Sequence, residues 1–411
     1  MAVSINEALN LIYKTTEPIN RFEAINTLTS NHRIVAKDIY ATKSLPRFDN
    51  SAMDGYAIKL SSSGETIACE KEILYAGAKE IPILGDNKTI KIMTGAVIPI
   101  NCEAVVPFEN VVLDVNENIV AFPDDIKLNA NIRMAGEELK NGEKCIMAGD
   151  TINSYTIGLL ASQGLSNIEV IEKPKVTILS SGDELRDFRD EELGDYELYN
   201  SNSPMFYARA TELGCDTNII DHCNDDIQGL EYQISKAILD SDILITSGGA
   251  SSGDKDLTKE AFLNAGMKMI FDKIEIKPGK PTAIGKINDT FIVILPGNPL
   301  AAMVNFELFI VPLISKLKGS NVFYHQVIEA KLADDINIKA GKQTAVLGNY
   351  NGNIFHSLKK QSPNMVSILK DANSMLITTA QVSKIEKNRI VKIIRLDSAM
   401  SIVNERNIFS D

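Results

Sequence analysis

A stretch near the middle of the chain, Asp242–Asp256, combines glycines, hydroxyls and carboxylates in a way that suits an anion and a metal ion. It opens with Ile243–Ile245, a continuous apolar run typical of a buried parallel strand. The glycines that follow can turn sharply and present backbone amides to a ligand, and nearby serines add hydroxyl donors. These residues are Ser247, Gly248, Gly249, Ser251, Ser252 and Gly253. Asp254 and Asp256 add hard oxygen atoms of the kind that Mg²⁺ takes as ligands beside substrate phosphates. An exposed loop whose glycines and acids only make turns is the competing interpretation.

The same order of apolar strand and glycine loop occurs twice more between residues 175 and 300. Val176–Leu179 leads into Ser180–Glu184, and Phe291–Leu295 leads into Pro296–Pro299. Alternating strands and helices predict an open α/β sheet, in which ligands bind outside the carboxyl ends of the strands. We therefore expect all three loops to lie at one edge of this sheet.

Two helical patterns follow these loops and begin with similar residues. One starts at Asn202-Ser203-Pro204 and ends near Gly214, and the other starts at Asn298-Pro299 and runs to Lys318. Each start places a capping residue beside a proline in the first turn. The amide-rich end of the second helix is expected to face an anion.

A basic hook, Ile276–Pro281, lies between the second and third strand-loop units. Prolines fix the backbone on both sides of a glycine that lets the chain turn, and the hook carries Lys277 and Lys280. Lysine is a compact point charge suited to phosphate or another oxyanion. Two ordinary exposed lysines on a proline turn are the alternative.

Five motifs together resemble one enzyme family. They are SGGASSGDKD at 247–256, IKPGKPTAIG at 276–285, LPGNP at 295–299, SSGDEL at 180–185 and PRFDNSAMDGYA at 46–57. The combination resembles the molybdopterin molybdenumtransferases, which include the bacterial MoeA enzymes and the gephyrin E domain, over essentially the whole chain. Molybdopterin adenylyltransferases of the MogA type are similar in the first motif but lack the MDGYA segment, which is therefore the discriminating signal.

This resemblance implies an enzyme of molybdenum cofactor biosynthesis that inserts molybdate into adenylylated molybdopterin and releases AMP. By family position, Asp256, Asp225 and Glu184 would hold Mg²⁺ against the pyrophosphate bond, where a metal neutralises developing charge. Lys277 and Lys280 would be catalytic residues that hold molybdate or the pterin phosphate. The remaining substrate contacts that the resemblance implies on these loops are Ser247, Gly248, Gly249, Ser251, Pro296, Gly297, Asn298 and Pro299.

The segment FDNSAMDGYA at residues 48–57 is too dense in carboxylate, amide and hydroxyl groups for a simple strand. An Asx-rich turn with apolar anchors is the structural alternative. In the family this segment reaches an active site formed with the α/β domain of the other protomer, so the resemblance implies a homodimer with shared sites. It makes Asp54 a catalytic candidate and Asp49 and Ser51 substrate-binding candidates, and Thr94 and Arg133 match further family positions.

Composition limits the class of protein. The chain has 411 residues, which suggests about two to four domains, and a net charge of −12. An acidic chain has no electrostatic footprint for nucleic acid, so we expect no such partner. Its five cysteines form no C-x-x-C pair, its four histidines form no zinc motif, and its N-terminus has no apolar signal core. The apolar region Phe291–Ile314 is interrupted by prolines and polar residues, so we expect a cytoplasmic protein without a membrane span.

The fold class that these patterns and the resemblance imply is multidomain α/β plus β. Residues 1–22 and 138–172 are expected to form a helical linker domain, and 23–137 an inserted β-rich domain that carries MDGYA. Residues 173–320 are expected to form an open, three-layer, MogA-like molybdopterin-binding domain, and 321–411 a C-terminal β-barrel-like domain. Within the second half of the linker, Ser154–Leu165 has the clearest helical pattern.

Some positions depart from the family pattern. Family members commonly carry arginine near 341–348, where this chain has Lys342 and then glycine at the second basic position. Two other functions stay open: an adenylyltransferase that uses ATP, and a non-enzymatic scaffold with the same fold. The presence of Asp54, Glu184, Asp225 and Asp256 argues against a scaffold. A molybdopterin adenylyltransferase is the expected pathway partner.

Overall fold

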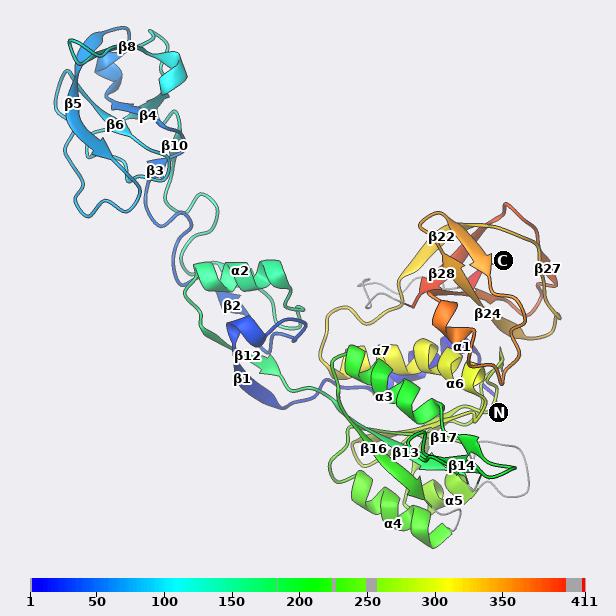
Figure 1. Cartoon of the computed structure of the whole chain (residues 1–411). Coiled ribbons are helices and arrows are strands. Elements are labelled where there is room, and N and C mark those ends of the chain that lie inside the picture. The colour runs from blue at the N-terminus through cyan, green and yellow to red at the C-terminus, as the bar shows by residue number, and fades with distance from the viewer. Residues whose placement is uncertain (1, 183, 224–226, 249–256, 397–408, 411) are drawn as a thin grey trace. The chain divides into compact units, whose positions relative to one another are not determined.

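The computed structural model describes residues 2–182, 184–223, 227–248, 257–396 and 409–410 (Figure 1). The chain forms two compact units. One comprises Met1–Ala36, Gly149–Ser154 and Asn167–Asp411, and the other comprises Lys37–Ala148 and Tyr155–Ser166. The first holds the α/β sheet and a C-terminal barrel, and the second holds the MDGYA segment.

The α/β sheet has the strand order β16-β13-β17-β21-β20-β18. The strands β16, β13, β17 and β21 are parallel, and β20 runs antiparallel to both of its neighbours. Their bounds are β13 Lys175–Ser181, β16 Asp216–Cys223, β17 Ile243–Ser247, β18 Lys268–Phe271, β20 Ala283–Ile287 and β21 Thr290–Leu295. The predicted parallel runs are thus confirmed, and the central strands β17 and β21 are buried along their whole length.

Helices cover both faces of this sheet, which gives the three layers expected from the sequence (Figure 1). On one face, α4 and α5 pack through residues such as Leu230 and Phe262. On the other, α3 and the long apolar helical run pack through Phe206 and Phe306, whose rings stack. The bounds are α3 Asn202–Glu212, α4 Ile227–Ala237, α5 Leu257–Asn264, α6 Pro299–Asn305, the π-helical segment η4 Phe306–Ile310 and α7 Val311–Leu317.

The run from Pro299 to Leu317 is, among the described residues, a helix long and apolar enough to cross a membrane by length and composition. In its most apolar window 83% of the residues are buried inside the structure, as in the core helix of a soluble protein. The buried strand and helix expected for this region are therefore confirmed.

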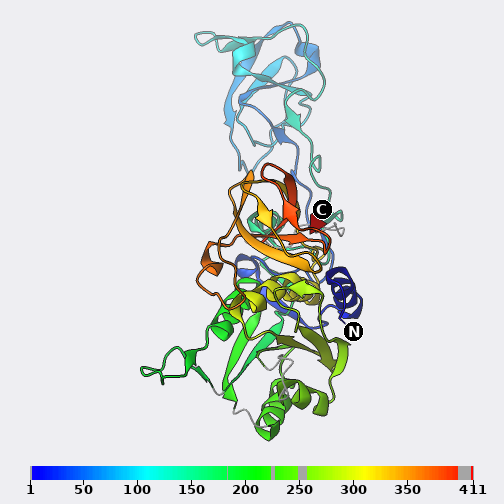
Figure 2. The same ribbon diagram turned by 90° about the vertical axis from the view of Figure 1, so that its right-hand side faces the viewer.

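The C-terminal part is a closed barrel. Its strands pair in the order β24-β25-β22-β28-β26, and β26 pairs again with β24, which closes the ring. The bounds are β22 Val327–Leu332, β24 Gln343–Tyr350, β25 Ile354–Ser357, β26 Ser374–Thr378 and β28 Ile390–Arg395. Figure 2 shows the barrel, in orange and red, next to helices α6 and α7 of the same unit. The short strand β19, Ile276–Lys277, joins β24 and so connects the basic hook to the barrel.

The segments 1–22 and 138–172 contain less helix than the sequence predicts. Helix α1, Ile5–Thr15, is capped by Ser4, whose Oγ accepts the N–H of Glu7 at 3.2 Å. Strand β1, Phe22–Asn26, pairs with β12, Asn167–Ile171. The helical expectation for residues 138–172 is therefore wrong outside helix α2, Ser154–Ser162. In β12 the alternating apolar side chains bury one face of the strand. This burial outweighs the helical preference of the segment.

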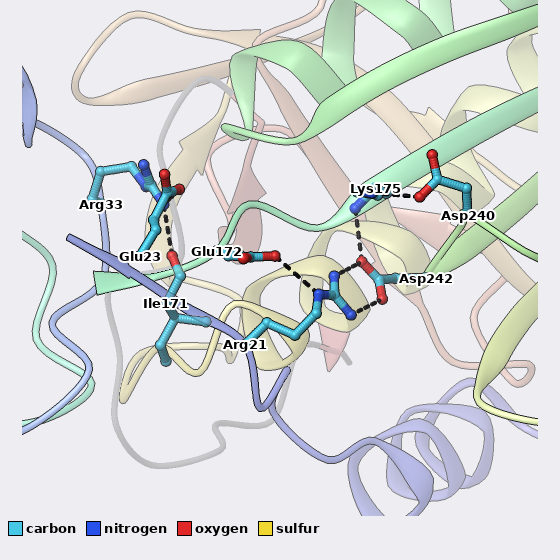
Figure 3. Close-up of polar contacts among 8 residues, drawn as sticks. All are labelled: Arg21, Glu23, Arg33, Ile171, Glu172, Lys175, Asp240 and Asp242. Atoms are coloured by element: carbon cyan, nitrogen blue, oxygen red, sulfur yellow. Dashed lines mark hydrogen bonds and ion pairs between the residues drawn. The ribbon is translucent and has the colours of Figure 1, made fainter. Parts of the chain in front are cut away.

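Ion pairs attach the β1–β12 pair to the start of the α/β sheet (Figure 3). The guanidinium of Arg21 lies between Glu172, at 3.0 Å, and Asp242, at 2.8 and 3.0 Å. Asp242 also accepts the backbone N–H of Lys175 at 2.8 Å. These carboxylate bonds raise the pKa of Arg21, the largest contribution coming from Asp242.

The second unit contains a sheet with the order β7-β4-β6-β5-β9-β8. Its bounds are β4 Gly55–Ile58, β5 Thr66–Leu74, β6 Lys88–Ile92, β7 Ala104–Pro107, β8 Val112–Asp114 and β9 Ile119–Ala121. A second ladder joins β3, Asn50–Ser51, to β10, Ile132–Arg133, and a third joins β2, Ile39–Tyr40, to β11, Lys144–Ile146. The expected β-rich character of this region is confirmed. Strand β4 contains the GYA of MDGYA and the following Ile58, and it is buried between its two neighbours.

Candidate active site

The carboxyl ends of three neighbouring strands lie at one level of the α/β sheet. Ser180 of β13 pairs with Ser247 of β17, which pairs with Leu295 of β21. The loops that begin after these residues therefore leave the sheet side by side. This confirms that the three loops begin at one edge, the position where open α/β sheets bind their ligands.

Two asparagines at the start of α3 make hydrogen bonds near this edge, and Asn202 is the one that joins two of the strand ends. The amide Nδ2 of Asn202 donates to Ser247 Oγ at 2.6 Å and to the carbonyl of Gly297 at 2.8 Å. Asn200 Nδ2 donates to Ser180 Oγ at 2.8 Å and to Ser203 Oγ at 2.9 Å. The sequence predicted Asn202 as a helix cap, but the cap position is Ser201 and Asn202 lies in the first turn. Sequence reasoning missed both roles, and the only signal was the closely spaced pair of asparagines before the helix.

Several predicted contact groups on the loops are engaged within the protein. Ser247 is buried, accepts the bond from Asn202, and donates from Oγ to Pro296 O at 3.2 Å. The N–H of Gly248 donates to Leu295 O at 3.2 Å, with a φ of 101° that favours glycine. Ser247 and Gly248 therefore shape the edge, and the backbone amide of Gly248 is not presented to a ligand.

The start of α6 also differs from the expected anion site. The first-turn amides of Leu300 and Ala301 donate to Pro363 O at 3.0 and 3.4 Å. Asn298 makes no side-chain capping bond, and its carbonyl accepts the N–H of Ala302. The expectation that these amides bind an anion is therefore wrong, because a carbonyl near the barrel already satisfies them. Asn298 itself stays exposed at the edge.

The basic hook lies at the same edge, because β20 begins just after it and Ala283 pairs with Ile294 near the end of β21. Lys277 and Lys280 are both exposed. Between them, Gly279 has a φ of 105°, and its carbonyl accepts bonds from Asn305 Nδ2 at 3.1 Å and Thr282 Oγ1 at 3.0 Å.

A cavity of about 320 Å³ opens beside Lys277 and Pro278 and extends to the barrel. Its other walls include Lys339, Thr344 and Gln361, whose amide is fixed by bonds to the backbone of Leu347. The cavity thus places Lys277 of the hook and Lys339 around one space, which the acidic residue Asp335 also lines. Lys342, the basic residue noted in the sequence, is not among its walls.

A larger cavity of about 500 Å³ lies between α3, α6 and the barrel. It is mostly apolar and contains the buried ion pair of Arg209 and Glu307, with distances of 2.8 and 3.1 Å. None of the site residues predicted from the sequence lines it. We place the candidate active site at the strand ends and not in this cavity, because a large volume does not by itself supply reacting groups.

In the second unit the fold brings together candidates that are far apart in the sequence. Ser51 pairs with Ile132 beside Arg133, and its carbonyl accepts the N–H of Gly95 at 2.8 Å. Asp49 Oδ1 accepts the N–H of Ala135 at 2.7 Å. The candidates Asp49, Ser51, Thr94 and Arg133 are therefore neighbours in one cluster.

Asp54 belongs to the same cluster. Its Oδ1 accepts both the backbone N–H and the Oγ1 hydroxyl of Thr94 at 2.7 Å. These bonds, the backbone one first, lower the pKa of Asp54, and its side chain is exposed. The structure therefore presents an exposed carboxylate that stays ionised near neutral pH.

Of the three predicted metal ligands, only Glu184 is among the residues that the structure describes. Glu184 is exposed just after β13, whereas Asp225 and Asp256 lie outside the described residues, as do Gly249 and Ser251. In the described ranges, no cluster of three or more His, Cys, Asp or Glu side chains could hold a metal ion.

Comparison with known proteins decides the family. Residues 3–164 match the MoeA N-terminal region (domain I and II), and residues 177–316 match a probable molybdopterin binding domain. A molybdopterin molybdenumtransferase of Staphylococcus aureus is 33% identical over 339 residues, covering 81% of this chain and 80% of the relative. One of Staphylococcus epidermidis is 32% identical over 408 residues, covering 96% of each. The chain belongs to the molybdopterin molybdenumtransferase family.

Solved structures agree with this assignment at the level of the fold. A molybdopterin biosynthesis MoeA protein of Pyrococcus horikoshii has a TM-score of 0.84 and 23% identity, covering 96% of this chain and 100% of that one. The resemblance inferred from the five motifs is thus confirmed. The family consists of transferases of molybdenum cofactor biosynthesis.

Proposed function

We propose that this protein inserts molybdate into adenylylated molybdopterin and releases AMP. The observation that carries the proposal is the alignment of the strand ends at Ser180, Ser247 and Leu295, with a basic hook at the same edge. An anionic pterin substrate and an oxyanion both need local cations, since the chain as a whole has a net charge of −12.

In this proposal Lys277 and Lys280 hold molybdate or the pterin phosphate. The cavity beside Lys277 has room for a tetrahedral oxyanion next to the charge of Lys277. Lys280 does not line this cavity but is exposed in the same hook. The exposed backbone at Gly297 and Asn298 would contact the pterin, together with Gly249 and Ser251. Ser247 and Gly248 act through the shape of the edge, because their polar groups bond within the protein.

Mg²⁺ is part of the proposal, with Glu184, Asp225 and Asp256 as its ligands. Carboxylates are the hard oxygen donors that Mg²⁺ takes, and the exposed Glu184 carboxylate at the strand ends fits that role. When bound, the ion would neutralise charge on the leaving phosphate. Asp256→Asn should therefore lower the rate of AMP release while the circular dichroism spectrum stays that of the folded protein.

We also propose a cytoplasmic homodimer with shared active sites, supplied by a molybdopterin adenylyltransferase. Each site would combine the Asp54 cluster of one protomer with the strand ends of its partner. An Asp54→Ala chain and an Asp256→Ala chain, each nearly inactive, should then complement when mixed. If mass spectrometry confirms subunit exchange and activity stays at the parental level, the shared-site proposal is wrong.

A product assay separates this function from the alternatives. The transferase releases AMP from adenylylated molybdopterin when molybdate is added, whereas an adenylyltransferase releases pyrophosphate from ATP and molybdopterin. A scaffold does neither. Pyrophosphate release with no AMP release would overturn the proposal in favour of the adenylyltransferase.

A further inference from the structure

Asn202 occupies a buried position beneath the loops of the candidate site. Its side chain joins residues 45 and 95 positions away along the chain, since Nδ2 donates to Ser247 Oγ at 2.6 Å and to Gly297 O at 2.8 Å. It thereby connects the end of β17 to the loop after β21. Only 7% of the residue is exposed, so water does not compete for these bonds.

The chemistry of the two acceptors requires an amide at this position. A carbonyl such as Gly297 O can only accept a hydrogen bond. The hydroxyl of Ser247 donates to Pro296 O at 3.2 Å, so its oxygen is left to accept from Asn202. Both acceptors therefore need a donor, and the NH₂ group of asparagine supplies two protons from one nitrogen.

The other end of the amide shows what this arrangement costs. The Oδ1 atom of Asn202 is buried and has no hydrogen-bond partner in the described part of the chain. Such groups are rare in native structures and call for a physical reason. Here the reason is that flipping the amide, which exchanges the positions of Oδ1 and Nδ2, would break the bonds of Nδ2 to Ser247 Oγ and Gly297 O.

We propose that Asn202 is a positioning residue that fixes the end of β17 against the loop after β21 in the register needed for the transferase reaction. This inference rests on the proposed function for its catalytic consequence, but the clamp itself is a property of the fold. Asn202 makes no substrate contact in this account. It acts by holding Gly297 and Ser247 in place.

Asn200 provides a matched control two residues away. Its Nδ2 contacts two hydroxyls, Ser180 Oγ and Ser203 Oγ, and its Oδ1 accepts the N–H of Ser203 at 3.1 Å. Hydroxyls rotate and can donate instead of accept. An aspartate at position 200 therefore keeps all three bonds, whereas an aspartate at position 202 faces the Gly297 carbonyl with like partial charge.

The test compares Asn202→Asp with Asn200→Asp in the full-length protein, by hydrogen exchange and by AMP release. We expect Asn202→Asp to speed exchange in peptides containing Gly297 and to lower the turnover number about tenfold or more, the scale of a misplaced reacting group. Asn200→Asp should stay within about twofold of the wild type in both measurements.

The pH profile gives a readout that a merely structural defect would not move. The groups that face position 202 are Ser247 Oγ and Gly297 O, and no charged side chain is among its bonded partners in the described chain. A protonated aspartic acid can donate to Gly297 O, so activity and exchange protection of Asn202→Asp should recover as the pH falls. Asn200→Asp should show no such recovery.

Each outcome decides the inference. Wild-type exchange rates in Asn202→Asp would show that there is no clamp. Faster exchange with unchanged turnover would show a clamp without a positioning role, and equal damage in both variants would remove the special role of Asn202. If the wild type itself released no AMP, the proposed function would fail, while the exchange experiment would still decide whether the clamp exists.

Discussion

Replacing Gly279 by alanine perturbs the basic hook at its most constrained point. A Cβ atom there would lie 1.9 Å from Nδ2 of Asn305 and 3.2 Å from the carbonyl of Ala301. Asn305 cannot move away cheaply, because it is fully buried and its amide donates to Gly279 O at 3.1 Å and Ala301 O at 2.9 Å. The backbone φ of 105° is a further cost for any residue with a Cβ.

These terms set the expected magnitude. A non-glycine residue in such a backbone conformation costs about 1–3 kcal/mol. Displacing the Asn305 amide loses a hydrogen bond worth about 1 kcal/mol. We therefore expect Gly279→Ala to lower the free energy of unfolding by about 2–4 kcal/mol, and to raise the molybdate concentration needed for half-maximal AMP release, because Lys280 follows directly.

A double-mutant cycle isolates the clash. Asn305→Ala alone should destabilise the protein, since it removes both hydrogen bonds. Adding Asn305→Ala to Gly279→Ala also removes the atom with which the new Cβ collides, so the double variant should be more stable than the sum of the two single costs predicts, by about 1 kcal/mol or more. Urea denaturation of the four proteins measures this. Stability of Gly279→Ala within about 0.5 kcal/mol of the wild type, or strictly additive costs, would show that the new Cβ does not collide with Asn305.

Three further predictions concern single groups. Burial lowers the pKa of His325 from 6.5 to about 4, so between these values the unfolded chain binds a proton that the folded one does not. This neutral histidine should therefore lower the free energy of unfolding by about 2 kcal/mol as the pH falls from about 7.5 to about 5. Urea denaturation of a His325→Gln variant should lose that part of the pH dependence. Glu307→Gln should lower the free energy of unfolding by about 3 kcal/mol, because Arg209 keeps its buried charge without its bidentate partner. The double variant Arg209→Met/Glu307→Leu, which removes both charges, should regain much of that stability. An equal loss of stability in the single and the double variant would contradict this. Thr94→Val removes one of the two bonds that lower the pKa of Asp54, so a carboxyl NMR titration should show that pKa moving up toward its ordinary value, whereas Thr94→Ser should leave it in place.

The strand and loop pattern was predictable because it is local. Each apolar run before a glycine loop, such as Ile243–Ile245, specifies a buried strand by its own composition. Once those strands are parallel neighbours, their carboxyl ends must meet at one edge. The position of the candidate site thus follows from short segments of sequence.

Contacts between distant segments could not be predicted in this way. Asn202 has the composition signal of a helix cap, and its partners Ser247 and Gly297 are brought to it only by the folded sheet. Likewise, the amides at the start of α6 have the pattern of an anion site, but the carbonyl of Pro363 fills it. Closure of the barrel by β26 pairing with β24 is also a tertiary event that no single strand encodes.

The strongest single test of the proposed reaction is the dependence of AMP release on molybdate. AMP release from adenylylated molybdopterin should rise with molybdate in the wild type and saturate. In Lys280→Ala the same curve should shift to higher molybdate concentration, while Lys268→Ala, which removes an exposed lysine of β18, should match the wild type. AMP release that ignores molybdate in the wild type would contradict the assigned reaction, and a Lys280→Ala curve lowered equally at every concentration would contradict an oxyanion role for the hook.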